Sequence, residues 1–407
     1  MSGDTSDKIV IFGAGAVGRG FIGELFSDAG WLVSFLDVNE RVVDTLRTEG
    51  CYEHRTVGPE VTVKQVGPVT AGYSTDTDYV SAEIATASVI ATSVGAAVLP
   101  EIAPVLQKAL LDRLAAGGDP IDILLCENLP RAAFVMRNLL NTGLNAAEKS
   151  LLNSSVGLVE TSVGRMIPVP DQIHSPTTIA AEPYRFLPID VAAMKGPSLR
   201  VPGLVCDETV DFEFFTCRKL YIHNMGHYLC GLLAQQAGYE LLWQGAVDPG
   251  IRYFTRAAMV ESALALAKVY NRPADALIEH VDDLLHRFDN KALGDTVARV
   301  VRDPLRKLAP DDRVFGAFSA AIEAGSPRRH LSLAVAAGAV NLEVTEGWQH
   351  RDTELYLRAT RDRTGTDWSD ADWALLQAQI TALRHHGFSF AEQRELIGDC
   401  FDPPSIP

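Results

Sequence analysis

The sequence lacks the features of a secreted, membrane-spanning or zinc-ribbon protein. Its six cysteines form no CxxC pair, the spacing typical of zinc ribbons and redox motifs. The opening residues, MSGDTSDK, are polar and acidic, and no run of about 18 apolar residues occurs. We therefore expect free thiols in a reducing compartment and a cytoplasmic protein.

Positive charge is also scarce. The chain has 36 Lys and Arg against 52 Asp and Glu, which gives a formal net charge of -16 at pH 7. This balance disfavours a large sequence-independent surface for nucleic acid or for an anionic membrane. We predict neither partner, and an anionic substrate must then be held by a local cluster of cations.

The chain does have the length and the apolar content for two cores. It has 407 residues, of which 47% are hydrophobic, so we expect two domains. Its first half alternates short β-branched runs with helical patterns, which is typical of a parallel sheet with crossover helices. Buried strands are predicted at 9–12, 32–36, 61–66, 88–92, 121–125 and 155–159. The predicted fold is α/β with an N-terminal Rossmann-type parallel sheet.

The second half has a different pattern. Past about residue 205 amphipathic stretches predict helices, at 208–236, 248–270, 273–287, 293–302 and 311–324. We therefore place a Rossmann domain at 1–204 and a second, mainly α-helical substrate domain at 205–407. The segment 163–204 contains seven prolines and is interpreted as the crossing between the domains. No motif is evident beyond about residue 350.

A glycine-rich motif opens the first domain. The stretch GAGAVG directly follows the apolar run KIVIF and places glycines at Gly13, Gly15 and Gly18. They permit the tight turn, the close approach of a pyrophosphate and the packing of helix on strand. Nineteen residues later Asp37 ends the second strand, where a carboxylate accepts bonds from ribose hydroxyls and repels a 2′-phosphate. We predict NAD rather than NADP; the alternative is a glycine-rich turn of another Rossmann-like protein, such as a methyltransferase.

A second informative stretch is FFTCRKLYIHNMGHYLCGLL, residues 214–233. At about 100° per residue Lys219, His223, Asn224 and His227 fall within an arc of about 140°, opposite an apolar face. One alternative is the solvated polar face of a packing helix. Another is a zinc site formed by His223 and His227, which lacks an obvious third ligand. We predict no metal.

Lys219, Asn224 and His227 form the pattern KxxxxNxxH, and here the chain resembles the polyol-specific long-chain dehydrogenases, the mannitol dehydrogenase family. The resemblance extends over FGAGAVGRGFIGELFSDAG (12–30), TSVGAAVLPEIAP (92–104), CENLPRA (126–132), VGLVETSVGRMIP (156–168), RKLYIHNMGHYLCGLLA (218–234) and RDPLRKLAPDDR (302–313). It implies a Rossmann domain followed by a helical substrate domain, and hydride exchange between NAD and a polyol without a metal.

The resemblance also implies roles for single residues. Lys219 would take the hydroxyl proton as hydride leaves, which requires burial or a neighbouring cation to lower its pKa toward about 7 to 8. Asn224 and Asn128 would stabilise negative charge on the substrate oxygen, and His227 would orient the substrate. Ser93 and Asn128 are expected at the cofactor. The alternative for Asn128 is a cap on the turn after a strand.

The chain departs from the family at one position. The family signature VDRI reads VGRM here, so Gly164 replaces an aspartate that contacts substrate hydroxyls. Glycine cannot make those hydrogen bonds. Either Glu160 or Glu127 compensates, or the substrate differs from mannitol.

Four cations near residue 305 predict an anion site, because guanidinium groups suit phosphate oxygens. The alternative is that these cations are ordinary charges at the surface or at helix ends. The expected substrate contacts are Arg302, Arg306, Lys307, Arg313, His223 and Glu160.

We hypothesise an NAD-dependent monomer or dimer that interconverts a polyol phosphate and a keto sugar phosphate, mannitol 1-phosphate and fructose 6-phosphate. The alternatives are action on a free polyol or sugar acid, a non-catalytic NAD-binding sensor, and a zinc-dependent alcohol dehydrogenase.

Overall fold

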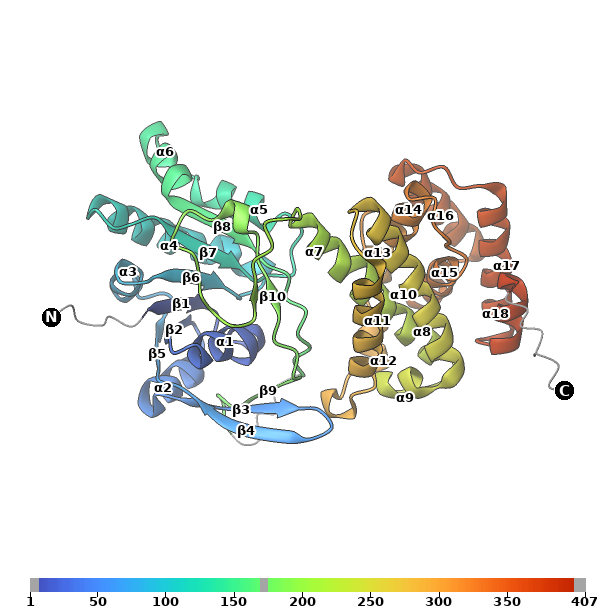
Figure 1. The fold of residues 1–407 in the computed structure, drawn as a ribbon, viewed down its shortest axis with the longest axis horizontal. Coiled ribbons are helices and arrows are strands. Elements are labelled where there is room, and N and C mark those ends of the chain that lie inside the picture. Colours follow the sequence, from blue (N-terminus) through green and yellow to red (C-terminus); the bar gives the residue numbers. More distant parts are fainter. Residues whose placement is uncertain (1–6, 169–174, 399–407) are drawn as a thin grey trace. The chain divides into compact units, whose positions relative to one another are not determined.

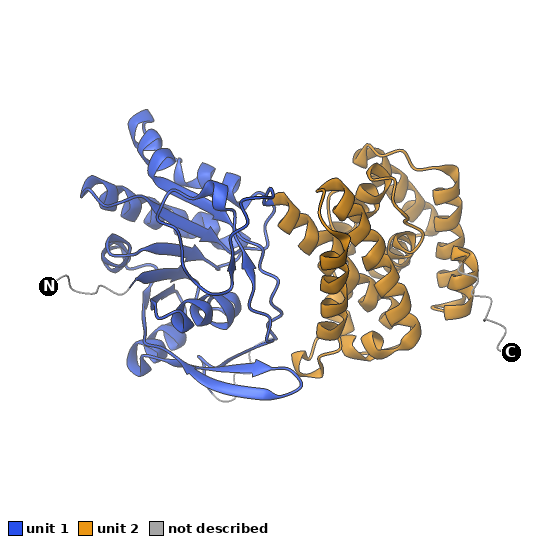
Figure 2. Cartoon of the chain, viewed as in Figure 1, with its two compact units in different colours: residues 1–212 blue, residues 213–407 orange. Residues whose placement is uncertain are grey.

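The computed structural model describes residues 7–168 and 175–398, and it divides into two compact units, 1–212 and 213–407 (Figure 2). The first unit is an α/β domain and the second is helical. Among the described residues, none of the helices combines the length and the apolar character needed to cross a bilayer.

The first unit is built on a six-stranded parallel sheet with the order β5-β2-β1-β6-β7-β8 (Figure 1). Side chains of β1 alternate between the two faces of this sheet, so Ile9 and Ile11 belong to one hydrophobic cluster and Val10 and Phe12 to the other. Both faces are therefore covered, as a parallel sheet requires. The strands are β1 (Lys8–Phe12), β2 (Leu32–Asp37), β5 (Val69–Tyr73), β6 (Val89–Thr92), β7 (Ile121–Leu125) and β8 (Val156–Glu160). The predicted α/β fold is confirmed.

Helices connect these strands and several begin at a side-chain cap. The side chains of Asn39, Asp76 and Asn145 accept backbone N–H groups at the starts of α2, α3 and α6, which satisfies donors that a helix leaves unpaired. The helices of this unit are η1 (Gly18–Gly23, a π-helical turn), α1 (Glu24–Asp28), α2 (Glu40–Glu49), α3 (Thr77–Ala85), η2 (Ala96–Val98), α4 (Leu99–Ala115), α5 (Ala132–Leu140) and α6 (Ala146–Ser155).

The prediction of a buried strand at 61–66 within the parallel sheet is wrong. This segment forms β4 (Val61–Val66), which pairs antiparallel with β3 (Tyr52–Val57) outside that sheet. Val61 and Val63 are 59% and 56% exposed. The edge position belongs instead to β5, which pairs with β2. β-Branched residues favour any strand, exposed or buried, so composition alone did not separate the two cases.

The proline-rich segment 163–204 lies within the first unit. Its strand β9 (Ile179–Ala181) pairs with β3, and β10 (Leu187–Pro188) pairs with β11 (Leu204–Val205), with the short helix η3 (Val191–Ala193) between them. The segment was predicted to cross between the domains. In the structure it also contributes strands to the first unit.

A buried ion pair attaches this segment to α1. Nη1 of Arg165 lies 2.5 Å from Oε2 of Glu24, and the two side chains are 0% and 2% exposed. Nζ of Lys64 lies 2.7 Å from the other oxygen of Glu24. Burial alone would raise the pKa of Glu24, but Arg165 and Lys64 outweigh it and lower the pKa to about 2. The Glu24 carboxylate is thus ionised and doubly paired in the interior.

The second unit is helical, as predicted, and is organised around α15, which is buried from Leu331 to Leu342 and contacts α8, α10 and α17. Residues past 350, where the sequence shows no motif, supply three helices, α16 to α18. The helices of the unit are α7 (Glu213–Cys217), η4 (Arg218–Asn224), α8 (Met225–Gln236), α9 (Leu242–Val247), α10 (Pro249–Val269), α11 (Ala274–Phe288), η5 (Lys291–Leu293), α12 (Val297–Val301), α13 (Pro304–Lys307), α14 (Phe315–Glu323), α15 (Leu331–Glu346), α16 (His350–Thr364), α17 (Asp370–His386) and α18 (Phe390–Ile397).

Candidate active site

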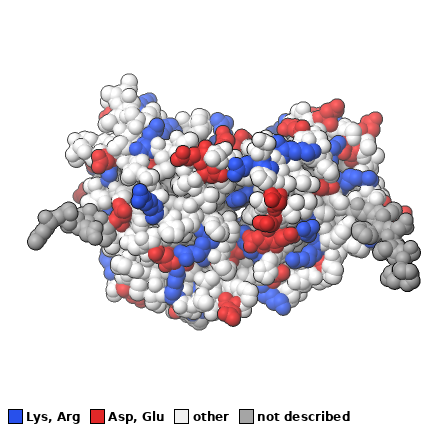
Figure 3. Space-filling view, viewed as in Figure 1, with Lys and Arg blue, Asp and Glu red and all other residues white. Residues whose placement is uncertain are grey.

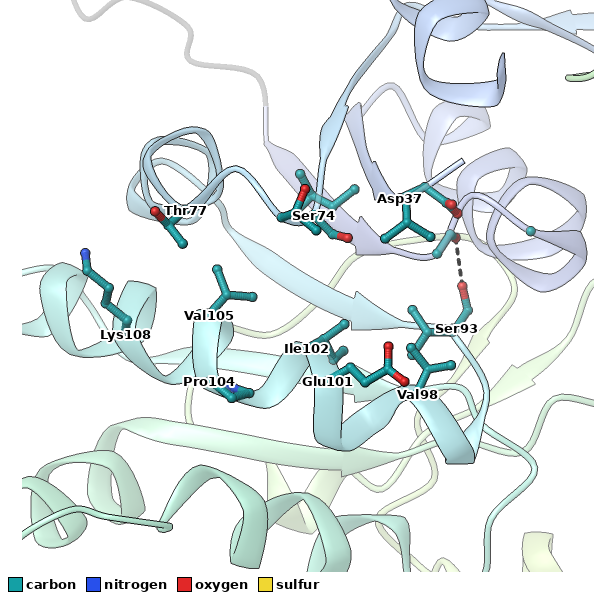
Figure 4. Close-up of a pocket in the computed structure, with 16 residues that line it drawn as sticks. Asp37, Ser74, Thr77, Ser93, Val98, Glu101, Ile102, Pro104, Val105 and Lys108 are labelled. Atoms are coloured by element: carbon teal, nitrogen blue, oxygen red, sulfur yellow. Dashed lines mark hydrogen bonds between the residues drawn. The ribbon is translucent and has the colours of Figure 1, made fainter. Parts of the chain in front are cut away.

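The glycine-rich turn joins β1 to η1 and leaves its backbone open at one point. A Cβ atom at Gly18 would lie 1.9 Å from the carbonyl oxygen of Gly13, so the close approach admits only glycine. At Gly15 nothing lies within 4 Å of the corresponding position, which is the open backbone that a pyrophosphate needs. Ser93 Oγ donates to the Gly13 carbonyl oxygen at 3.0 Å and so steadies the turn (Figure 4).

Asp37 connects the end of β2 to this turn. Its Oδ2 accepts the backbone N–H of Ala14 at 2.6 Å, and its Oδ1 accepts that of Asn39 at 2.9 Å. An ionised carboxylate offers about four acceptor positions, so two remain for ribose hydroxyls. Asp37 therefore combines a structural bond with the geometry expected of a ribose contact.

A pocket of about 630 Å³ lies beside these residues (Figure 4). Gly13, Gly15, Asp37 and Ser93 line it together with an apolar wall, Val38, Val98, Ile102, Pro104 and Val105. Polar groups and an apolar wall in one pocket suit the ribose and the flat adenine of a dinucleotide. The residues of the first unit thus fit NAD, which when bound supplies the hydride acceptor.

Three polar residues lie at the carboxyl edge of the sheet, two just after β7 and one at the end of β8. Glu127 is buried, and it accepts hydrogen bonds from Thr92 Oγ1 at 2.7 Å and from the Val94 N–H at 3.1 Å. Burial raises the pKa of this carboxyl group. Glu160 accepts the N–H of Ala133 at 2.9 Å, at the start of α5. Both carboxylates therefore have structural bonds. Asn128 is exposed and lies in the bend after β7.

The backbone at Gly164 does not require glycine. A Cβ atom there would make an ordinary contact, 3.4 Å, with the ring of Tyr184. Only a steric clash or a left-handed backbone would demand glycine, and neither applies at this position. The loss of the family's carboxylate is thus a change that the fold tolerates and does not impose.

In the second unit the helix with the KxxxxNxxH pattern contains a π-helical turn, η4. The N–H of Met225 donates to the carbonyl oxygen of Leu220, five residues back. Because such a turn rotates less per residue than an α-helix, Lys219 and Asn224 lie closer in angle than the 100° wheel predicted. Ser262 Oγ on α10 donates to the carbonyl oxygen of Tyr221 at 2.9 Å and satisfies an oxygen of the widened turn.

Lys219 has the electrostatic character that a proton acceptor needs. Desolvation in its half-buried position and the nearby Arg313 guanidinium lower the pKa of the Lys219 ammonium to about 8. A substantial share of the amine is therefore neutral just above neutral pH. Asn224, at the end of η4, is also half-buried.

His227 is paired with a carboxylate that the sequence did not suggest. Its Nε2 lies 2.9 Å from Oδ2 of the buried Asp295, whose Oδ1 accepts a bond from Nε of Arg299 at 2.8 Å. Burial raises the pKa of Asp295, but His227 and Arg299 outweigh it and lower the pKa to about 2. The two partners are 68 residues apart in sequence, and no motif spans that distance.

His223 has different surroundings. It is buried, and its ring lies 5.8 Å from the ring of Phe288 between centroids. Burial, together with the Arg287 guanidinium, holds the pKa of His223 well below its usual value, so this ring is neutral. In residues 7–168 and 175–398, no group of three or more His, Cys, Asp or Glu side chains is arranged to hold a metal ion.

The structure brings the four predicted phosphate-binding cations into one cluster. Burial lowers the pKa of Lys307 to about 8, with contributions from Arg313, Arg306 and Arg302. Lys307 itself is buried, and its Nζ donates to the Val300 carbonyl oxygen at 2.5 Å. Lys307 thus has a structural bond within the cluster.

The three arginines of the cluster differ in exposure. Arg313 is buried, with its Nε 2.7 Å from Oδ1 of Asp312. The side chains of Arg302 and Arg306 are 71% and 53% exposed, and their carboxylate neighbours lie 3.7 and 3.8 Å away, beyond a hydrogen bond. These two are therefore available to a soluble anion. On the face shown in Figure 3, acidic and basic side chains are interspersed.

Two family models match this chain. The mannitol dehydrogenase Rossmann domain covers residues 7–203, and the mannitol dehydrogenase C-terminal domain covers residues 211–347. The chain belongs to the mannitol dehydrogenase family. It is an NAD-dependent polyol dehydrogenase, as the motifs and the cofactor pocket predicted.

Two solved structures resemble the whole chain. One is a D-sorbitol dehydrogenase in substrate-free form, with a TM-score of 0.78, 15% identity and coverage of 95% of each chain. The other is Pseudomonas fluorescens mannitol 2-dehydrogenase in a ternary complex with NAD and D-mannitol, with a TM-score of 0.72 and 17% identity. That comparison covers 98% of this chain and 95% of the other. At these identities the likeness shows a shared fold.

Proposed function

We propose that this enzyme interconverts a polyol phosphate and a keto sugar phosphate, namely mannitol 1-phosphate and fructose 6-phosphate, as a mannitol-1-phosphate 5-dehydrogenase does. The observation that carries the proposal is the cation cluster of Arg302, Arg306, Lys307 and Arg313, of which Arg313 also acts on Lys219. A phosphate dianion is attracted to such a cluster, and two of its arginines are exposed.

In the proposed reaction Lys219 accepts the proton of the substrate hydroxyl as hydride leaves the same carbon. The amides of Asn224 and Asn128 donate hydrogen bonds to the oxygen that carries the developing charge, and His227 orients the substrate. In the reverse direction Lys219 returns the proton. A pKa of about 8 for Lys219 allows both roles near neutral pH.

Kinetics with matched substrates tests the phosphate assignment. We expect kcat/KM for mannitol 1-phosphate to exceed that for mannitol by about 10- to 100-fold, since charge-assisted hydrogen bonds contribute about 1.5–3 kcal/mol. Arg306→Ala should lower kcat/KM for mannitol 1-phosphate by about tenfold and leave the rate with mannitol unchanged, because it removes one such bond.

Three outcomes would replace this proposal. Higher efficiency with mannitol, mannonate or altronate would assign the enzyme to a free polyol or a sugar acid. NADH binding without turnover of any polyol or ketose would indicate a sensor. Loss of activity on chelation, together with stoichiometric zinc, would indicate a zinc-dependent alcohol dehydrogenase.

We also propose that Asp37 selects NAD. Asp37→Ala should weaken NAD binding by about tenfold or more, because hydrogen bonds to a charged group are lost, and it should raise the ratio of NADP to NAD efficiency. Steady-state kinetics with both cofactors measures this. The ratio is an internal control, because loosening of the turn at Ala14 alone weakens both cofactors equally. An unchanged ratio would mean that another group excludes the 2′-phosphate.

A further inference from the structure

We propose that Asp295 is a positioning residue that holds His227 as the Nε2–H tautomer, so that Nδ1 of His227 accepts a hydrogen bond from a substrate hydroxyl. This inference rests on the proposed function, in which His227 orients the substrate. Among the residues that the structure describes, Asp295 is the only hydrogen-bond partner of the His227 ring, with Nε2 and Oδ2 2.9 Å apart.

The charge of Asp295 decides which nitrogen carries the proton. An ionised carboxylate only accepts hydrogen bonds. Asp295 is ionised, because the hydrogen bonds from His227 and Arg299 outweigh its burial and lower its pKa to about 2. Nε2 must therefore be the donor, and in a neutral imidazole the other nitrogen is then an acceptor.

Asp295 is itself fixed in place. Its carbonyl oxygen accepts the N–H of Leu242 at 2.9 Å, and its neighbour Thr296 forms an isolated bridge with Leu241. Arg299 Nε holds Oδ1 at 2.8 Å, so the carboxylate is bound on both oxygens. The geometry is that of a rigid support behind a functional side chain, which fixes both the orientation and the tautomer of the ring.

The imidazole is also confined by packing. The ring of Phe288 lies 5.3 Å from that of His227, and the ring of His223 lies 6.3 Å away. Because Nε2 is bonded to Asp295 and the ring is held by its neighbours, the direction in which Nδ1 can accept a hydrogen bond is fixed.

The tautomer limits what His227 can bind. A hydroxyl group can donate to Nδ1, whereas a ketone oxygen or an ionised phosphate oxygen has no proton to donate. His227 therefore contacts a hydroxyl that is present in both substrate and product, and not the carbonyl that is formed or the phosphate. An analogue without that hydroxyl should lose affinity in both directions of the reaction.

Nitrogen NMR of the full-length protein with NADH bound tests the tautomer directly. The His227 signals are assigned from their loss in His227→Gln, and we expect the wild type to show a protonated Nε2 and an unprotonated Nδ1. Asp295→Asn can donate its amide to Nε2, so it should move the proton to Nδ1 and lower kcat/KM by about 10- to 100-fold, the usual effect of a lost supporting partner. Asp295→Glu keeps an acceptor and should retain the wild-type tautomer.

Asp282→Asn is the matched control. Asp282 is an exposed acid on α11 that pairs with Arg256 at 2.7 Å, so its replacement should change neither the tautomer nor turnover. A protonated Nδ1 in the wild type, or an Asp295→Asn variant with unchanged tautomer and turnover, overturns the inference. The wild-type spectrum decides even if Asp295→Asn does not fold. If polyol phosphates are not turned over but the tautomer is as stated, the proposed function fails and the role of Asp295 stands.

Discussion

We expect Lys219→Ala to lower kcat for polyol oxidation by about 10²- to 10⁴-fold, the usual contribution of a positioned base, and to leave NADH affinity nearly unchanged. The reason is that the role proposed for the lysine concerns the substrate proton, whereas the cofactor pocket is formed by residues of the first unit. Steady-state kinetics and titration of NADH fluorescence measure the two effects separately.

Two variants serve as controls for this result. Lys219→Arg keeps the positive charge, but a guanidinium stays protonated, so it should be as inactive in oxidation as Lys219→Ala. Lys268→Ala removes an exposed lysine on α10 and should leave kcat unchanged. A loss of NADH affinity equal to the loss of kcat would show that Lys219 serves the cofactor instead.

The same group predicts the pH dependence of both directions. Desolvation and Arg313 lower the pKa of Lys219 to about 8, and only the neutral amine can accept a proton. The rate of oxidation should therefore rise as the pH increases through about 8, and the rate of reduction should fall over the same range. Arg313→Met removes the neighbouring cation and should move both profiles to higher pH.

Arg165→Met should destabilise the protein by about 3 kcal/mol, the second large effect that we expect. Removing one partner of a buried ion pair is costly because the other charge, here Glu24, whose side chain is 2% exposed, is then left with the more exposed Lys64, whose Nζ lies 2.7 Å away. Nε of Arg165 also donates to the Glu182 carbonyl oxygen at 2.7 Å, and that bond is lost as well. Urea denaturation followed by circular dichroism measures the change in the free energy of unfolding.

The control is an exposed pair. Arg256→Met breaks the Arg256–Asp282 bridge, which lies at the surface, and should cost no more than about 1 kcal/mol.

The ion pair of Arg165 and Glu24 also predicts how stability depends on pH. Because the pKa of Glu24 is lowered in the folded state to about 2, the contribution of Glu24 to the free energy of unfolding is complete above about pH 4.5 and is lost as the pH falls toward 2. Arg165→Met should flatten this acid dependence. Equal losses for the two variants would mean that burial of Arg165 contributes nothing.

Much of the first unit could be predicted because its strands are short, apolar and β-branched. The errors occur where that rule fails. Residues 61–66 have strand composition but are mostly exposed, whereas β5 has the sequence VTAGY, in which small and polar residues hide an edge strand of the parallel sheet. Pairing with β2 buries it, and pairing is a property of the whole fold that a local pattern does not contain.

The candidate site was predictable to the extent that it lies on one motif or one helix. The glycines with Asp37, and Lys219 with Asn224 and His227, each occupy a single local segment. Asp295 escaped prediction because its relation to His227 exists only after α12 packs against α8. The π-helical turn escaped because a wheel of 100° per residue assumes regular bonding.

That turn also constrains how the enzyme can change over evolution. If residues 218–224 changed to regular α-helical bonding without a change in length, the backbone hydrogen bonds would improve and the helix itself would be favoured. The same change would rotate Lys219 by about 90° relative to His227, because each residue of the turn would then add about 100°, and it would separate the two groups. The conformation with the best backbone bonding is thus not the one that aligns the side chains. Substitutions that regularise this turn should be eliminated by selection for activity, although they would stabilise the helix.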